Sequence, residues 1–263
     1  MGCGWLGLPL GEHLLSLGFR VKGSTTSEER LNTLHSKSIE PYILRVTEEG
    51  IIGEMNFFSS VDNLIIAMPT GLRSNPKRKF DLMMNHVKKA CIEQGIKEVV
   101  FISSTSVYGN LYGIITEKSI TEPETNSGKQ LLQCEELLSN SVHLNTTILR
   151  MGGLIGADRH PVFQLSKKAF VTNPKGSVNL IHLTDCINII SSLIGQPIVK
   201  NVYNCVTPYH PNRVEYYTQM AIQLDCKPPL FKDSATFDRK ISSEKLLQNF
   251  NDAFRVKNLL ISS

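Results

Sequence analysis

The chain has 263 residues, of which 41% are hydrophobic and 20% charged, and its formal net charge is +4. A chain of this length can bury a sizeable core, and it lies at the upper end of the size range of one domain. Its charge is ordinary and gives no reason to expect a nucleic-acid partner. No apolar run reaches the roughly 18 residues of a membrane span, and no signal peptide is recognisable. We therefore expect a soluble, cytoplasmic protein that binds neither nucleic acid nor membranes.

Six cysteines are scattered along the chain, with no CxxC pair and no His/Cys cluster at metal-ligand spacing. This distribution is typical of reduced thiols in an intracellular protein. We expect no metal site.

A glycine fingerprint stands at the start of the chain, in Gly2-Cys3-Gly4-Trp5-Leu6-Gly7. In a dinucleotide-binding turn the first glycine allows the tight turn, the second lets the backbone approach a pyrophosphate, and the third lets helix and strand pack closely. The N–H groups of the following helix attract the diphosphate. We therefore expect Gly2, Gly4 and Gly7, with Trp5 and Leu6 beside them, to bind a dinucleotide. A glycine-rich turn without a ligand is the alternative.

This fingerprint normally connects a buried strand to a helix, and here only the helix has a counterpart. Leucines from Leu8 to Leu17 form an apolar face that Gly18 closes, whereas only Met1 precedes the turn. Without a central strand its two neighbours would lie about 9 to 10 Å apart, twice the usual spacing. We therefore expect a sequence that starts too late, as in a truncated isoform, gene model or fragment. The alternative is that the apolar tail Leu259-Leu260-Ile261 fills the gap.

Strand and helix signals alternate through the first 150 residues, which is typical of parallel βαβ units. Strands are expected at 19–23, 41–46, 61–68, 99–103 and 146–150, and helices at 28–35, 75–94 and 126–140. The second helix should begin at Asn75-Pro76, with Asn as the cap and Pro at the first helical position.

After Arg150 the chain changes to loops rich in Gly and Pro. Short strands at 178–182 and 201–206 accompany helices at 184–194 and 213–224. We expect a Rossmann-type, doubly wound parallel sheet in residues 1–150 that lacks its first strand. Residues 151–263 should form a smaller substrate-side lobe.

The choice between NAD and NADP depends on the residues after the second strand signal. An NAD site usually has a carboxylate there for the ribose 2′-hydroxyl. The segment 22–27 contains no acid, and Ser24, Thr25 and the nearby Arg30 suit a 2′-phosphate better. We therefore expect NADP, with NAD as the alternative. The hydroxyl groups also suit capping of the following helix, and the two roles are compatible.

Three later motifs follow the glycine fingerprint in the order of one enzyme family. They are SSTSVYG at 103–109, LRMGGLIG at 149–156 and NLIHLTD at 179–185. Together they resemble the extended short-chain dehydrogenases, the NAD-dependent epimerase/dehydratase family, over about residues 2 to 225. GWLG, TNSG and Arg159-His160-Pro161 make the chain most similar to a YeeZ-like subgroup. The resemblance implies a nicotinamide cofactor and oxidation, epimerisation or dehydration of a sugar-like substrate.

The resemblance also implies a set of site residues. Near the cofactor they are Ala67, Met68 and Pro69 at the adenine ribose, and Ser103 and Thr105 at the nicotinamide. Arg159, His160 and Asn179 would bind the substrate, although a plain turn explains Arg159-His160 equally well. The expected partners are a sugar-like small molecule and, as one option, a second copy in a homodimer.

The Tyr–Lys pair that moves protons in this family is not in place. With Glu135 at the family's acidic position, Ser127 stands where the Tyr belongs and Leu131 where the Lys belongs. A Ser hydroxyl is a far weaker acid than a phenol, and Leu has no charge. Lys129 lies only two residues from Ser127, so it points in another direction on the helix.

Two alternatives follow from the missing pair. The usual catalysis is lost, and the protein is a non-catalytic, cofactor-binding regulator or scaffold. Otherwise the reaction uses groups other than the Tyr–Lys pair. The catalytic candidates are then Ser104, Tyr108, Ser127 and Lys129, and His160 is a further candidate.

Overall fold

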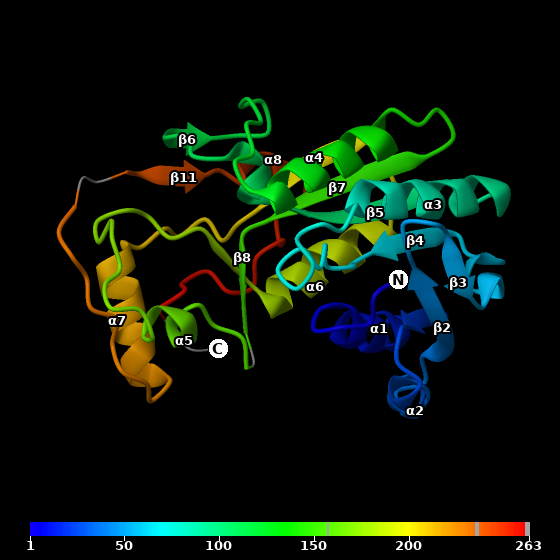
Figure 1. The fold of residues 1–263 in the computed structure, drawn as a ribbon, viewed down its shortest axis with the longest axis horizontal. Helices are drawn as coiled ribbons and strands as arrows, with labels where there is room; N and C mark the ends of the chain where they lie inside the picture. Colours follow the sequence, from blue (N-terminus) through cyan, green and yellow to red (C-terminus); the bar gives the residue numbers. More distant parts are fainter. Residues whose placement is uncertain (157, 235–236, 261–263) are drawn as a thin grey trace. The chain divides into compact units, whose positions relative to one another are not determined.

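The computed structural model describes residues 1–156, 158–234 and 237–260 (Figure 1). They form two compact units, each assembled from three stretches of the chain. Unit 1 comprises Met1–Gly109, Thr121–Arg150 and Ile190–Val202, and unit 2 comprises Asn110–Ile120, Met151–Ile189 and Tyr203–Ser263. The expected division at residue 150 therefore differs from these units in two segments: 110–120 belongs to unit 2 and 190–202 belongs to unit 1. Sequence patterns did not indicate that the chain returns in this way.

Unit 1 is built on two sheets whose strands are largely parallel. The first has the order β1-β2-β3, with β1 (Lys22–Thr25) parallel to β2 (Glu40–Val46) and β3 (Ile51–Gly53) antiparallel. The second has the order β10-β7-β5-β4, from β4 (Asn63–Ile66), β5 (Glu98–Ser104), β7 (Asn145–Met151) and β10 (Asn201–Cys205). In β5, Val99, Val100 and Phe101 are fully buried, as expected for a strand covered on both faces.

The helices of unit 1 bury apolar stripes in this core. They are α1 (Gly7–Ser16), α2 (Glu29–Ser36), α3 (Phe80–Glu93) and α4 (Asn126–Ser139), with short 3-10 turns η1 (Met55–Phe58) and η2 (Thr105–Tyr108). In α1, Leu10 and Leu14 are buried, and Gly18 follows the helix with a φ of +88°, a conformation that suits glycine.

The predicted start of α3 at Asn75-Pro76 is wrong. Asn75 Oδ1 accepts a hydrogen bond from the Lys77 N–H at 3.3 Å, which makes a turn, and the helix begins only at Phe80. There the Phe80 N–H donates to Gln130 Oε1 of α4 at 2.5 Å. A side chain 50 residues away therefore serves the N-terminus of α3.

In the part of unit 2 that the structure describes, there are two small parallel pairs of strands and four helices. β6 (Gly113–Ile115) pairs with β11 (Arg239–Ile241), and β8 (Gly153–Ile155) pairs with β9 (Leu180–His182). The helices are α5 (Val162–Leu165), α6 (Leu183–Ile194), which continues into unit 1, α7 (Arg213–Gln223) and α8 (Glu244–Asn249).

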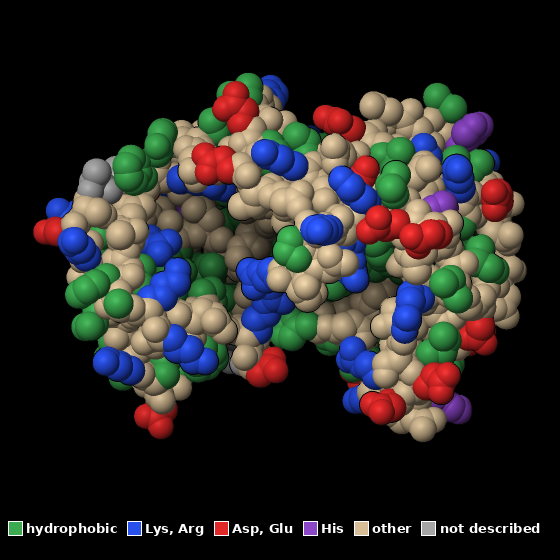
Figure 2. Space-filling model, in the orientation of Figure 1, with side chains coloured by type: hydrophobic (Ala, Val, Ile, Leu, Met, Phe, Trp, Pro, Cys, Tyr) green, Lys and Arg blue, Asp and Glu red, His purple; other side chains and the backbone are tan. Residues whose placement is uncertain are grey.

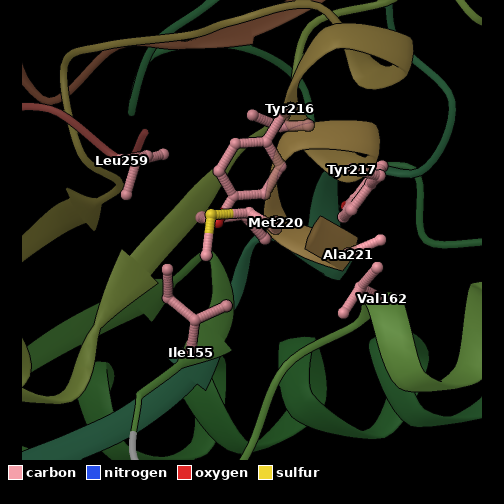
Figure 3. Packing of buried hydrophobic residues seen from close by; sticks show 9 residues of the cluster. Ile155, Val162, Tyr216, Tyr217, Met220, Ala221 and Leu259 are labelled. Atoms are coloured by element: carbon pink, nitrogen blue, oxygen red, sulfur yellow. The ribbon is translucent and has the colours of Figure 1, made fainter. Parts of the chain in front are cut away.

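A cluster of buried side chains around α7 forms a core of unit 2 (Figure 3). Leu259 is part of this cluster, and the Leu260 carbonyl accepts hydrogen bonds from Gln219 and Gln223 of α7. The prediction that the apolar tail fills a gap in the parallel sheet is therefore wrong for Leu259 and Leu260. Ile261 lies outside the described residues.

The surface carries charges of both signs. Figure 2 shows Lys and Arg side chains together with Asp and Glu side chains across the drawn face. Within the described residues, no helix combines the length and the apolar character needed to cross a membrane.

Candidate functional site

The glycine turn leads into the N-terminus of α1 in unit 1. Gly2 has a φ of +87°, which favours glycine, and a Cβ there would lie 3.0 Å from the carbonyl carbon of Ala67. A Cβ on Gly7 would lie 2.3 Å from the Gly2 carbonyl oxygen. A Cβ on Gly4 would meet nothing within 4 Å. Packing therefore requires glycine at positions 2 and 7, whereas Gly4 faces open space.

The N-terminus of α1 is open to an anion. Its N-cap position is held by Leu6, no side chain among the described residues caps the helix, and its first turn contains no acidic residue. The first N–H groups of a helix lack intrahelical acceptors and carry the positive end of the helix dipole. This arrangement matches the needs of a diphosphate.

The end of β1 shapes the glycine turn from the other side. Ser24 Oγ accepts a hydrogen bond from the Gly2 N–H at 3.1 Å, and the Ser24 carbonyl accepts one from the Cys3 N–H at 3.1 Å. Thr25 Oγ1 accepts one from the Ser27 N–H at 3.2 Å. Both hydroxyl groups thus support the local backbone, while Arg30 lies exposed on α2. Their contact with a 2′-phosphate stays a prediction.

The end of β4 completes this part of unit 1. The Ala67 N–H donates to the Met1 carbonyl at 3.0 Å, and Met68 N would lie 3.1 Å from a Cβ on Gly2. Leu6 is buried, while Pro69 is exposed just beyond the strand. The structure therefore brings the glycine turn together with the ends of β1 and β4, where the sequence predicted the adenosine end of a cofactor.

A buried network joins α4 to β5 and β7. Arg150 Nη2 lies 2.6 Å from Glu135 Oε2, and Arg150 Nη1 donates to the Tyr108 hydroxyl at 2.9 Å. Ser103 Oγ donates to Glu135 Oε1 at 2.5 Å. Desolvation opposes the charge of Arg150, but its hydrogen bonds to Glu135 raise its pKa, so it stays protonated. We call these four residues the Glu135 network.

The Glu135 network uses two residues that the sequence suggested for chemistry. Tyr108 has no exposed surface and its ring lies 4.9 Å from the Arg150 guanidinium carbon, so it holds Arg150. The Ser103 hydroxyl is directed to Glu135. Their geometry supports a structural role and not contact with a substrate or nicotinamide. Two features of the sequence could have indicated this network. Glu135 lies within the apolar stripe of α4, and Arg150 ends an apolar strand.

The residue at the position expected for the catalytic Tyr has no charged hydrogen-bond partner among the described residues. Ser127 Oγ lies 3.1 Å from Thr70 Oγ1, and no carboxylate, imidazole or ammonium is bonded to it in the part of the chain that the structure describes. Leu131 is buried and Lys129 is exposed. Ser127 therefore has no base that could activate it.

Ser104 stands at the end of β5, where its side chain starts η2. Its Oγ accepts a hydrogen bond from the Ser106 N–H at 3.1 Å. The neighbouring Thr105 is buried. The Ser104 hydroxyl still has its own proton to donate, so its role as a catalytic residue stays a prediction.

The substrate-binding candidates all lie in unit 2. His160 Nδ1 accepts a hydrogen bond from the Val162 N–H at 3.1 Å, and its Nε2 lies 2.9 Å from the Tyr216 hydroxyl. Burial lowers the pKa of His160 to about 4, so the ring is neutral at pH 7. Arg159 pairs through its backbone with Gly156. His160 is thus half-buried and bonded to Tyr216 of α7.

Asn179 connects two distant segments of unit 2. Its Nδ2 donates to the Arg239 carbonyl at 2.8 Å, and its Oδ1 accepts from the Ile241 N–H at 2.8 Å. Both hydrogen-bonding ends of the amide therefore stabilise β11. A contact with substrate stays a prediction that this geometry does not favour.

Comparison with known proteins identifies the family of this chain. No protein-family profile matches it. Protein YeeZ of Escherichia coli strain K12 is 36% identical over 239 residues, which cover 89% of this chain and 86% of the relative. The chain belongs to the YeeZ family. The resemblance of its motifs to the extended short-chain dehydrogenases and their YeeZ-like subgroup is thus confirmed.

Solved structures show the fold of this YeeZ homologue. UDP-glucuronic acid 4-epimerase from Bacillus cereus, in complex with NAD, matches with a TM-score of 0.75 and 15% identity over 98% of this chain and 94% of the other. RMD from Pseudomonas aeruginosa, complexed with NADPH, matches with a TM-score of 0.65 and 15% identity over the same shares. The YeeZ homologue is therefore an α/β protein with a parallel sheet that matches Rossmann-fold epimerases and dehydratases.

Proposed function

We propose that this YeeZ homologue binds NADP at the glycine turn, with NAD as the alternative cofactor. The observation that carries the proposal is Gly4, which faces open space beside the uncapped N-terminus of α1. Gly2, Gly4 and Gly7 hold the pyrophosphate, and Arg30 pairs with the 2′-phosphate. Support for a nicotinamide cofactor also comes from the NAD and NADPH named in the two structural neighbours.

A bound nicotinamide would supply a hydride acceptor or donor. The matching proton would have to be transferred by a side chain of this protein. Among the described residues, Thr70 is the one side-chain partner of Ser127, and Leu131 is buried and uncharged. Tyr108 is held by Arg150. We therefore propose cofactor binding without proton transfer of the Tyr–Lys type, as in a regulatory or scaffold protein.

A second candidate is an oxidoreductase or epimerase that acts on a sugar-like substrate. The Ser104 hydroxyl favours it, because this group follows β5 and retains a proton. The name of one structural neighbour, a UDP-glucuronic acid 4-epimerase, suggests the substrate class.

Fluorescence titration with NADPH and NADH tests the proposal. Gly4→Ala adds one methyl group where the chain has space, so the fold should persist while NADPH affinity falls about tenfold or more, or about 1.4 kcal/mol. Gly50→Ala is the matched control, since a Cβ on Gly50 also meets nothing within 4 Å. Absence of binding by the folded wild-type chain would overturn the proposal.

Turnover distinguishes the two candidates. Incubation of the NADPH- or NAD-loaded protein with a panel of nucleotide sugars should give no change in nicotinamide absorbance and no epimerised product. Turnover that is lost in Ser104→Ala would instead establish the enzyme.

A further inference from the structure

A basic segment connects β4 to α3 in unit 1. Residues 71–79 contain Arg73, Lys77, Arg78 and Lys79 and no acidic residue. All of them precede α3, so none of these charges lies on a helix. Ligands of open α/β sheets bind beyond the carboxyl ends of the strands, and this segment follows that end of β4. We call residues 71–79 the basic loop.

Hydrogen bonds within the basic loop define its shape. The Gly71 carbonyl accepts hydrogen bonds from the Ser74 N–H at 3.2 Å and from the Asn75 N–H at 3.0 Å. Gly71 has a φ of +69°, and a Cβ there would collide with Arg78 Nη1 and lie 2.9 Å from Arg78 Cζ. The half-buried Arg78 guanidinium therefore lies directly against the turn at Gly71.

Helix α4 holds the basic loop in place. Asn126 Nδ2 donates to the Pro76 carbonyl at 2.9 Å, and Gln130 Nε2 donates to the Arg78 carbonyl at 2.8 Å. Lys129 is exposed and lies three residues after Asn126, on the same face of the helix. Its ammonium therefore adds a further positive charge beside the loop. Figure 2 shows Lys and Arg side chains over the starts of α3 and α4.

The acidic residues near the basic loop leave most of its charge uncompensated. Glu48 Oε1 accepts a hydrogen bond from the Lys79 N–H at 2.9 Å, so Lys79 has a carboxylate beside it. Asp81 lies in the first turn of α3, where the helix dipole favours an acid. Glu124 Cγ would lie 3.7 Å from a Cβ on Gly109. Among the described residues, no salt bridge joins any of these acids to the basic loop.

Arg73, Lys77, Arg78 and Lys129 thus form a group of cations that has no salt bridge within the part of the chain that the structure describes. Like charges repel each other, and an anion that binds beside them offsets this repulsion. A guanidinium binds the oxygens of a phosphate in pairs. A phosphate monoester carries a charge of about −1.5 to −2 at pH 7, so it suits several cations better than a single carboxylate does.

We propose that the basic loop and Lys129 bind the phosphate group of a small phosphorylated molecule. The Arg78 guanidinium, positioned against Gly71, donates hydrogen bonds to the phosphate oxygens, and Lys77 and Lys129 add positive charge beside it. This ligand is distinct from the cofactor, whose phosphates are assigned to the glycine turn and Arg30. The proposal goes beyond cofactor binding and does not rest on it.

The test is an NMR titration of the cofactor-free chain with glucose 6-phosphate. Glucose is the matched probe that lacks the phosphate. The backbone amide signals of Gly71, Ser74 and Lys77 should shift and saturate with glucose 6-phosphate and should not move with glucose. The Kd should rise with ionic strength, because salt screens exposed charges.

Three variants locate the phosphate. Arg78→Gln should raise the Kd for glucose 6-phosphate about tenfold or more, about 1.4 kcal/mol. Lys77→Gln changes an exposed side chain, should raise this Kd about threefold, and serves if Arg78→Gln does not fold. Lys79→Gln is the matched control in the same loop and should change the Kd less than about twofold, because Glu48 lies beside Lys79. The Kd for NADPH should be the same in all three.

Four outcomes would overturn the proposal. Signals that do not saturate, or that shift equally with glucose, exclude a phosphate site. Equal binding of sulfate that disappears at about 0.15 M salt indicates an adventitious ion only. Tighter binding of a single-stranded oligonucleotide assigns the loop to nucleic acid. An equal loss of NADPH affinity in Arg78→Gln assigns the loop to the cofactor. A wild-type chain that binds no NADPH would refute the proposed function and leave the glucose 6-phosphate titration unaffected.

Discussion

Arg150 and Glu135 form a buried ion pair in which Arg150 Nη2 lies 2.6 Å from Glu135 Oε2, with side-chain exposures of 8% and 4%. Arg150 Nε also lies 3.1 Å from both carboxylate oxygens. Charges this deep are tolerated only when paired and fully hydrogen-bonded. The pair therefore fixes α4 against β7, and α4 carries Ser127 and Leu131, the positions that depart from the family pattern.

We predict that breaking this pair destabilises the protein strongly. Glu135→Gln or Arg150→Met alone should lower the free energy of unfolding by about 3 to 5 kcal/mol, because either leaves one buried charge unpaired. The double variant should cost much less than the sum. Urea denaturation of the four proteins measures the coupling energy. Strict additivity would show that the two side chains act independently.

The preference for NADP should depend on Arg30. Arg30→Glu should raise the Kd for NADPH about tenfold or more, about 1.4 kcal/mol, and leave that for NADH nearly unchanged. Arg45→Glu makes the same change of charge at another exposed position of unit 1 and serves as the control. Equal losses for both cofactors, or for both variants, would contradict a specific contact with the 2′-phosphate.

Ser127 should matter little for any reaction. Ser127→Ala removes one hydrogen bond to Thr70, so the free energy of unfolding should fall by about 0.5 to 1.5 kcal/mol. NADPH affinity should not change. Thr70→Ala is the matched variant, and the two changes should be less than additive. A cofactor-linked turnover that disappears in Ser127→Ala alone would restore this serine as a catalytic residue.

His160 should make the protein sensitive to acid. Burial lowers its folded-state pKa to about 4, below the ordinary value of 6.5, so the unfolded chain binds the proton more readily. Its contribution to stability is complete above about pH 6.5 and is lost as the pH falls towards 4. Tm measured from pH 7 to pH 4 should fall less steeply in His160→Phe. The exposed His143→Phe is the control and should keep the wild-type slope.

Much of unit 1 could be predicted from sequence because its elements carry their own signals. β5 contains the continuous apolar run Val99–Ile102, and α4 starts one residue after its cap, Thr125, whose Oγ1 accepts a hydrogen bond from the Gly128 N–H. The start of α3 could not be predicted, because Gln130 and Glu48, distant in sequence, accept the hydrogen bonds of Phe80 and Lys79. Local capping rules do not include partners that tertiary structure supplies.

The same distinction holds for the candidate site. The glycine turn follows from local backbone constraints, so its sequence pattern predicted its shape. The roles of Tyr108 and Ser103 depend on Arg150 and Glu135, which approach from other elements. His160 and Asn179 likewise bind partners more than 50 residues away. A sequence motif identifies such residues but does not predict which residues they contact in the folded chain.

The chain passes between unit 1 and unit 2 five times, at 109/110, 120/121, 150/151, 189/190 and 202/203. Neither unit can therefore be obtained by a single truncation. A fragment ending at Arg150 lacks Ile190–Val202, which supplies the end of α6 and the start of β10 to unit 1. Genetic dissection of this protein calls for point substitutions within the whole chain, and a limited-proteolysis fragment would retain its structure only while the nicked pieces remain associated.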